Sequence, residues 1–197
     1  AVSRLQLKQT PALTLVRNHS MATGVAMLAI AKQLGRSDMD QLFLYAILHR
    51  LGQFVLLSHP RTKHRYEDVL AHIRRHQVPY GNAEIRVLGI THSWLGGMLA
   101  QHWNFPLEFV HILLPYEKGG DGDDQDLDHI CELVRLADQV AMASGQGTPE
   151  GYPIDEDAIL HNGCEIGIFP SENPMDLERF MEDMMSQWAA ARALWPA

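Results

Sequence analysis

Apolar residues recur every three or four positions along most of this chain, which is the spacing of one face of an α-helix. Over residues 13–34 this spacing predicts a helix, with Gly35 placed to end it. Residues 37–57 carry a wider apolar stripe, with Ser37 as a capping residue and His59-Pro60 as a stop. We therefore expect one uninterrupted helix over 37–57 at the centre of the core.

The same pattern predicts six further helices, over residues 66–76, 83–102, 107–114, 127–144, 155–161 and 174–194. Residues 79–82 carry a turn signal. Gly96-Gly97 lies inside the predicted helix 83–102, where each glycine costs about 1 kcal/mol against alanine. Such a cost is tolerated where another backbone packs closely or the helix bends. Because strand pairs and internal repeats are not evident, the predicted class is an all-α helical bundle.

The length of 197 residues fits a single domain. Two segments are predicted to be loops: residues 119–126, which are rich in Gly and Asp, and residues 145–153, which are rich in Gly and Pro. The chain opens on AVSRLQL with no initiator methionine. We therefore expect a fragment of a longer protein, with residues 1–12 as the end of a preceding helical part.

The charge balance narrows the class of partner. Sixteen Lys and Arg residues against twenty-four Asp and Glu give a net charge of −8, which disfavours nucleic acid as the main partner. Only four of the cations are lysines, and the longest apolar run, Leu42–Leu48, is too short to span a membrane, so no membrane partner is expected. Protonation of all eleven histidines, whose reference pKa is about 6.5, would bring the charge from −8 to +3. The two cysteines, Cys131 and Cys164, are expected to be reduced thiols in a cytoplasmic protein.

Chemistry is most plausible at polar residues within apolar helices. His19, His49, His92 and Asp138 each lie in such a segment, on four different predicted helices. Brought together in a bundle core, three imidazoles and a carboxylate would make a site for Fe, Mn, Zn or Ni. Taken singly, each is more commonly a hydrogen-bonded core residue.

Four stretches of the chain, together covering residues 17–141, carry a family resemblance: RNHSMATGVAMLAIA, LFLYAILHRLGQFVLL, EIRVLGITHSWLGGMLAQHWNFP and ICELVRLADQVA. They resemble the HDOD family, the HD-related output domain of the HD superfamily of metal-dependent phosphohydrolases. The resemblance implies an HD-like helical bundle and a role in bacterial signal transduction. It also implies other signalling proteins or domains as partners, with homo-oligomerisation as an option.

Arg50 is the main departure from the active HD pattern, because active enzymes have an aspartate directly after the second histidine. A guanidinium has no lone pair for a metal and keeps its charge. The resemblance also implies a histidine pair further along the chain, but Pro115-Tyr116 stands in its place, with His111 four residues earlier. We therefore expect a non-catalytic regulatory domain without a cofactor, acting through protein or ligand contacts. The alternative is a degenerate phosphohydrolase that binds a divalent metal and acts on a nucleotide or phosphodiester.

Two structures are possible for Arg50. A buried Arg50 would need a carboxylate, and the resemblance would bring Asp138 near it, so that the ion pair would fill the former metal site. Alternatively, Arg50 extends from the helix surface to solvent.

A basic segment follows the central helix. His72 and His76 are one helical turn apart and could bind a metal, but the nearby arginines make a solvated basic face the better interpretation. This face is also a possible docking surface for an acidic partner, formed by Arg65, His72, Arg74, Arg75 and His76.

Overall fold

The computed structural model describes residues 10–114 and 125–193. Within this part of the chain all regular structure is helical, so the all-α prediction is confirmed. The helices are α1 (Pro11–Gln33), α2 (Met39–Leu48), α3 (Leu51–Ser58), α4 (Tyr66–His76), α5 (Tyr80–Leu88), α6 (His92–His102), α7 (Leu107–Leu113), α8 (Gln125–Ala143), α9 (Glu156–Ile166) and α10 (Pro174–Ala193).

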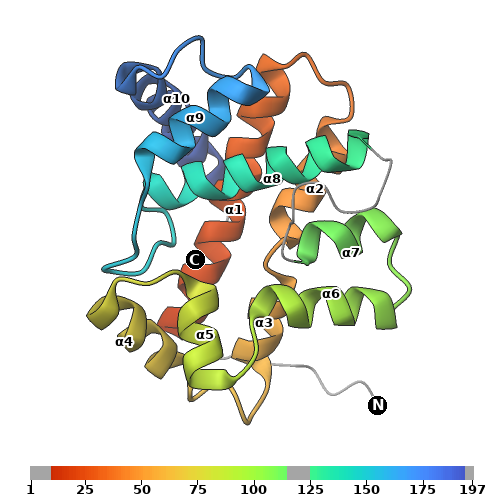
Figure 1. The fold of residues 1–197 in the computed structure, drawn as a ribbon, viewed down its shortest axis with the longest axis vertical. Coiled ribbons are helices and arrows are strands. Elements are labelled where there is room, and N and C mark those ends of the chain that lie inside the picture. Colours follow the sequence, from red (N-terminus) through yellow and green to blue (C-terminus); the bar gives the residue numbers. More distant parts are fainter. Residues whose placement is uncertain (1–9, 115–124, 194–197) are drawn as a thin grey trace.

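Helix α1 is the axis of the molecule, and α8 crosses it near the middle (Figure 1). On one side of this crossing, α1 packs with α2, α8, α9 and α10 around a buried apolar cluster that includes Met27, Ile30 and Leu133. On the other side, the start of α1 packs with α3, α4 and α5 around Leu56, Val69 and other buried residues. Helices α6 and α7 lie against each other along one edge. The crossing of α1 and α8 is therefore the point at which the two core clusters meet.

The long helices follow the predicted apolar spacing. Helix α4 has the predicted bounds, and α1, α8 and α10 agree within two residues at each end. The Thr10 side chain accepts a hydrogen bond from the Leu13 amide over 3.1 Å, and Pro11 occupies the first turn, so the start of α1 is capped by local chemistry. The loop predicted over 145–153 lies between α8 and α9, whereas residues 119–124 of the other predicted loop lie outside the described residues.

The predicted single helix over 37–57 is wrong, because the chain breaks it into α2 and α3 at His49 and Arg50. Arg50 has φ −103° and ψ 26°, away from helical values. The apolar pattern continues on both sides of this turn, so periodicity alone gives no sign of it. Two adjacent side chains, which on a regular helix would point about 100° apart, can both turn inward here.

The segment Met39–Ser58 is long and apolar enough, by composition, to cross a membrane, although polar residues interrupt its apolar sequence. The core helix of a globular domain has the same composition, and 44% of this segment is buried inside the molecule. In the structure this segment is the α2–α3 pair, which contains the turn at Arg50 and contacts α1, α6 and α8.

The predicted helix over 83–102 is also two helices. Helix α5 begins at Tyr80, inside the segment predicted as a turn, and ends at Gly89, which has φ +79°. Helix α6 then begins at His92, where the Thr91 side chain accepts a hydrogen bond from the Trp94 amide over 3.1 Å. Helix α9 extends to Ile166, five residues past its predicted end.

Of the two explanations considered for the glycine pair within α6, a closely packed backbone is the one found. A Cβ atom added to Gly52 on α3 would lie 1.9 Å from the His92 carbonyl oxygen and 2.7 Å from the Gly96 nitrogen. A Cβ atom on Gly97 would lie 2.4 Å from the Leu114 side chain. Helices α3 and α6 therefore pack backbone against backbone, which fixes the start of α6 relative to the turn at Arg50.

Candidate functional site

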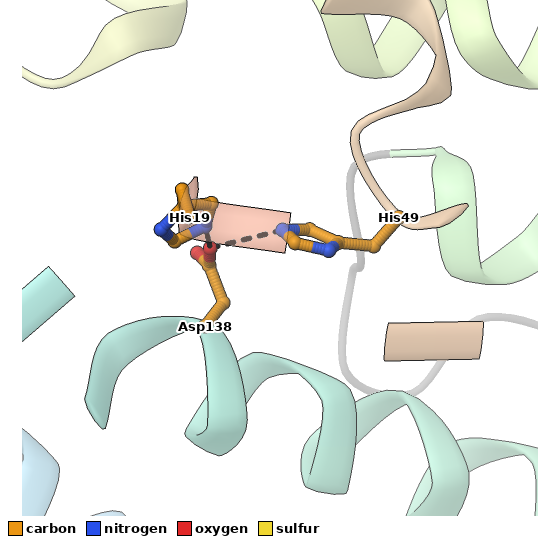
Figure 2. Close-up of side chains that lie close together, drawn as sticks. All are labelled: His19, His49 and Asp138. Atoms are coloured by element: carbon orange, nitrogen blue, oxygen red, sulfur yellow. Dashed lines mark hydrogen bonds and ion pairs between the residues drawn. The ribbon is translucent and has the colours of Figure 1, made fainter. Parts of the chain in front are cut away.

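Three side chains from different parts of the chain meet where α1 and α8 cross (Figure 2). His19 comes from α1, His49 from the turn between α2 and α3, and Asp138 from α8. Asp138 Oδ1 lies 2.7 Å from His19 Nε2 and 3.0 Å from His49 Nε2. One ligand atom from each of these three side chains lies within 4.8 Å of the other two. The structure thus brings together three of the four residues that the sequence singled out.

Arg50 completes this cluster. Its side chain is only 4% exposed, and its NH2 group donates a hydrogen bond to Asp138 Oδ1 over 2.8 Å. Its Nε group donates to His49 Nε2 over 3.1 Å, and its guanidinium carbon lies 4.9 Å from the centre of the Tyr80 ring. Of the two structures considered for Arg50, the buried ion pair is therefore the correct one, and extension to solvent is wrong.

The hydrogen bonds around His49 determine where its proton lies. His49 Nδ1 is 2.5 Å from the Ala46 carbonyl oxygen, which can only accept, so Nδ1 carries a proton. In the neutral ring Nε2 is then an acceptor, and it accepts the hydrogen bond of Arg50 Nε. His49 Nε2 and Asp138 Oδ1 therefore both direct lone pairs at the guanidinium. Arg50 supplies the positive charge that holds these two acceptors together.

His19 is a neutral donor in this cluster. Burial and the charge of Arg50 lower the pKa of His19 from 6.5 to about 3. Its Nε2–H donates to Asp138, while its Nδ1 is buried and has no hydrogen-bond partner among the described residues. The loop after α8 packs against the backbone of α1 at this point, because a Cβ atom on Gly147 would lie 2.3 Å from the His19 backbone nitrogen.

The charges of Arg50 and Asp138 support each other. Burial alone would lower the pKa of Arg50 and raise that of Asp138. The attraction between the two, the hydrogen bonds to Asp138 and the tyrosines beside Arg50 together outweigh burial, so the pKa of Arg50 is raised and that of Asp138 is held well below its usual range. The Asp138 side chain is 27% exposed and borders a pocket of about 120 Å³ lined also by Tyr152 and Ile154. Asp138 is therefore the member of this cluster that is in contact with solvent.

The donor atoms do not fit a metal ion in this arrangement. Nitrogen and oxygen ligands that share one ion at about 2.1 Å lie roughly 3.0–3.4 Å apart, in octahedral or tetrahedral geometry. Here His19 Nε2 and Asp138 Oδ1 are at the 2.7 Å of a hydrogen bond, with a proton between them. The lone pairs of His49 Nε2 and Asp138 Oδ1 are taken by Arg50. An ion would have to displace the guanidinium and remove the His19 proton from this contact.

His92, the fourth predicted residue, lies outside this group. Its Nδ1 is 2.6 Å from Glu84 Oε2, and its backbone amide donates to the same oxygen over 2.8 Å. The other Glu84 oxygen accepts from the Tyr66 hydroxyl over 2.5 Å, and Tyr66 in turn accepts from Gln53 over 2.6 Å. The break before α6 places His92 in this second network, where one fully buried carboxylate joins α3, α4, α5 and α6.

The predicted basic face is divided between two sides of α4. The Arg74 side chain forms an exposed ion pair with Glu150 over 3.1 Å, on the side that faces the loop after α8. Arg65 precedes α4 and donates a hydrogen bond to the Val87 carbonyl. His72 and His76 are in contact, with ring centres 4.3 Å apart. Partial burial and the charges of His76, Arg86 and Arg75 lower the pKa of His72, so these four side chains share the other side.

A sequence comparison identifies the family. The sequence model of the HDOD domain matches residues 2–117, more than half of the chain. This chain belongs to the HDOD domain family. No curated protein matches the sequence of this HDOD domain.

Two solved structures share the fold. An HDOD domain protein of unknown function from Geobacter sulfurreducens is 19% identical, with a TM-score of 0.73 over 93% of this chain and 63% of that chain. A "putative signal transduction protein" from Marinobacter aquaeolei VT8 is 18% identical, with a TM-score of 0.56 over 95% of this chain and 40% of that chain. This HDOD domain therefore spans less than two thirds of either solved chain.

The sequence analysis did not single out four residues that lie in the clusters described above. Tyr80 lies against Arg50, Tyr152 borders the pocket at Asp138, Glu84 holds His92, and Arg86 joins the histidine pair. Glu84 carries the one usable sign, a carboxylate between the apolar residues Ala83 and Ile85 in a predicted helix. The two tyrosines and Arg86 depend on how α5 and the loop after α8 pack, which periodicity does not contain.

Proposed function

We propose that this HDOD domain is a non-catalytic regulatory domain of a bacterial signal-transduction protein. It acts by binding other signalling proteins or domains, or a small ligand. The observation that carries this proposal is the position of the Arg50 guanidinium, which hydrogen-bonds to both His49 Nε2 and Asp138 Oδ1. The Marinobacter aquaeolei relative, described as a signal transduction protein, supports the assignment to signalling.

The chemistry of the cluster favours a structural role over hydrolysis. A hydrolase of the HD type needs an activated water beside open ligand positions on a dication. In this cluster His19 is a neutral donor to Asp138 Oδ1, and Arg50 donates to both Asp138 Oδ1 and His49 Nε2. Arg50 is a permanent cation that repels a dication and cannot act as a base. The cluster therefore joins α1, α8 and the α2–α3 turn rather than presenting a reactive group.

A degenerate metal-dependent phosphohydrolase is the second candidate function. It is favoured by the proximity of His19, His49 and Asp138, whose ligand atoms lie within 4.8 Å of one another. If Arg50 swung out, these three side chains would hold Fe, Mn, Zn or Ni, and the ion would supply an activated water for attack on a phosphoester. This candidate requires that the ion pair break.

Metal content and hydrolysis separate the two candidates. The untagged protein, purified without chelator and dialysed, should retain no stoichiometric Fe, Mn, Zn or Ni by elemental analysis. It should not hydrolyse bis(p-nitrophenyl) phosphate or nucleotides. Retention of about one equivalent of metal, or hydrolysis that disappears in His49→Ala, would establish the enzyme instead.

Arg50→Asp provides the positive control. It removes the blocking cation and adds a carboxylate beside His19, His49 and Asp138, so Zn²⁺ or Mn²⁺ should bind measurably in calorimetry. His49→Ala in the Arg50→Asp background should abolish that binding. If the wild-type protein binds the same ions as tightly as Arg50→Asp, the guanidinium does not block the site and the proposal is wrong.

A further inference from the structure

The basic residues of this chain are concentrated on one part of the surface. Six of the sixteen Lys and Arg residues lie between residues 61 and 86, with only three of the twenty-four acidic residues. One of those three, Glu84, is fully buried under His92 and does not reach the surface. A protein with a net charge of −8 therefore presents a locally cationic surface over α4 and α5, which lie side by side (Figure 1).

The centre of this surface is a cluster of four side chains, which we call the α4–α5 cluster: His72, Arg75, His76 and Arg86. His72 and His76 are in ring contact at 4.3 Å, and Arg75 follows His72 by three residues on the same helix. Arg86 lies on α5, which packs against α4, and the charges of both arginines lower the pKa of His72. Among the described residues, neither Arg75 nor Arg86 forms an ion pair. Like charges gathered without counter-charges are costly in the free domain, and an anionic partner relieves that cost.

The neighbouring residue indicates what kind of anion fits. Ile85 precedes Arg86 on α5 and is 54% exposed, although its size and apolarity favour burial. Arginine is enriched at protein interfaces, and an apolar side chain beside it adds surface that a polypeptide can cover. A free phosphate would use the guanidinium groups and leave Ile85 in water. The combination therefore favours a polypeptide that carries both carboxylates and apolar side chains.

We propose that the α4–α5 cluster, together with Ile85, is a docking surface for an acidic segment of a partner signalling protein. The inference rests on the proposed function, because it names the chemistry of the partner through which a non-catalytic domain would act. This surface differs from the one predicted from the sequence. Arg86 and Ile85 are added to it, and Arg74 is removed because it is paired with Glu150 on another side of α4.

The helix itself supplies a matched control. Arg74 and Arg75 are adjacent and both exposed, and their side chains point about 100° apart around α4, with Arg74 directed to Glu150. Arg74→Glu and Arg75→Glu change the net charge of the protein by the same amount. Only Arg75→Glu changes the proposed surface, so a difference between the two variants reports position and not overall charge.

The experiment uses fluorescence anisotropy with a labelled peptide of about a dozen residues in which Glu alternates with Leu, at low salt. Arg75→Glu combined with Arg86→Glu should raise the Kd at least about tenfold, whereas Arg74→Glu should change it less than about twofold. A peptide with Lys in place of Glu should bind the double variant better than the wild type. Urea unfolding midpoints should be unchanged, because all three arginines are exposed.

Two peptide comparisons test the apolar contact. Replacing Leu by Ser in the peptide should weaken binding to the wild type severalfold, and Ile85→Ser should remove that difference. The inference is wrong if Arg74→Glu weakens binding as much as Arg75→Glu, or if no peptide binds. It is also wrong if inorganic phosphate displaces the peptide when the two are present at the same concentration of negative charge. That result would make the cluster a simple anion site. None of these results affects the metal and hydrolysis tests at Arg50, so the two proposals can fail separately.

Discussion

Arg50 and Asp138 are 88 residues apart in the sequence and are joined by a 2.8 Å hydrogen bond at the point where α8 crosses α1. The contact depends on the turn between α2 and α3, which directs Arg50 inward beside His49. The same carboxylate oxygen also accepts from His19 on α1. One atom of Asp138 thus ties α8 to α1 and to the α2–α3 turn.

A double-mutant cycle should measure this ion pair. Asp138→Asn leaves a buried cation without its counter-charge and should lower the free energy of unfolding by about 3–5 kcal/mol. Adding Arg50→Met removes the unpaired cation and should recover much of that loss. The measurement is urea unfolding of the wild type, both single variants and the double variant at one pH. A coupling energy below about 0.5 kcal/mol would mean that the two residues do not stabilise each other.

His19 should make the domain less stable in mild acid. Burial and the charge of Arg50 lower the pKa of His19 to about 3, whereas in the unfolded chain it takes up a proton below about pH 6.5. Between these values only the unfolded state binds the proton. The free energy of unfolding should therefore fall as the pH falls, by up to about 1.4 kcal/mol per pH unit.

His19→Gln tests this dependence, because glutamine can still donate to Asp138 and does not titrate. Urea unfolding between pH 4.5 and 6.5 should show a shallower slope for His19→Gln than for the wild type. His102→Gln, which changes an exposed histidine on α6, is the control and should keep the wild-type slope. Equal slopes for His19→Gln and the wild type would show that His19 is not buried as a neutral ring.

The second network should contribute strongly to stability. Glu84→Ala would leave the Tyr66 hydroxyl and both His92 donors without their acceptor inside the protein. We expect a loss of about 3 kcal/mol or more in urea unfolding. Glu150→Ala removes a carboxylate from an exposed pair with Arg74 and should cost less than about 0.5 kcal/mol. Similar losses for the two variants would contradict the network.

Gly147 and Gly145 allow a test of whether the loop after α8 packs against the backbone of α1 near His19. Both have φ +76°, so alanine at either position costs about 1–2 kcal/mol from backbone strain. At Gly145 nothing lies within 4 Å of the added Cβ, whereas at Gly147 it would lie 2.2 Å from the Leu15 carbonyl oxygen. Gly147→Ala should therefore be the more destabilising by at least about 1.5 kcal/mol in urea unfolding. Equal losses would mean that the loop does not pack on α1.

The sequence predicted α1, whose apolar spacing ends at Gly35, and α4, whose predicted bounds agree with the structure. It failed at the two breaks, because apolar spacing continues through both. The second break does carry signals, since Gly89 ends α5 and Thr91 caps α6. The break at Arg50 carries no such signal in the neighbouring residues, and the partner of Arg50 there is a carboxylate 88 residues away.

The contrast between local signals and long-range contacts also explains which residues of the site could be predicted. His19, His49 and Asp138 were found because polar residues inside apolar helices are conspicuous. His92 has the same appearance, and its separation from the others follows from where α6 begins. The partners Tyr80, Tyr152 and Glu84 have no distinguishing spacing, so only the packing of the helices identifies them.

The turn at Arg50 gives the domain a cation that is encoded in the gene. A side chain is present in every copy of the protein as soon as it is translated, in one-to-one ratio with Asp138, and a chelator cannot remove it. A protein that needs a bound ion can lose its function when the concentration of that ion falls. The contact between Arg50 and Asp138 does not depend on the concentration of an ion. Assembly of the α1–α8 crossing therefore depends on the chain alone, with the charge of Asp138 balanced from within.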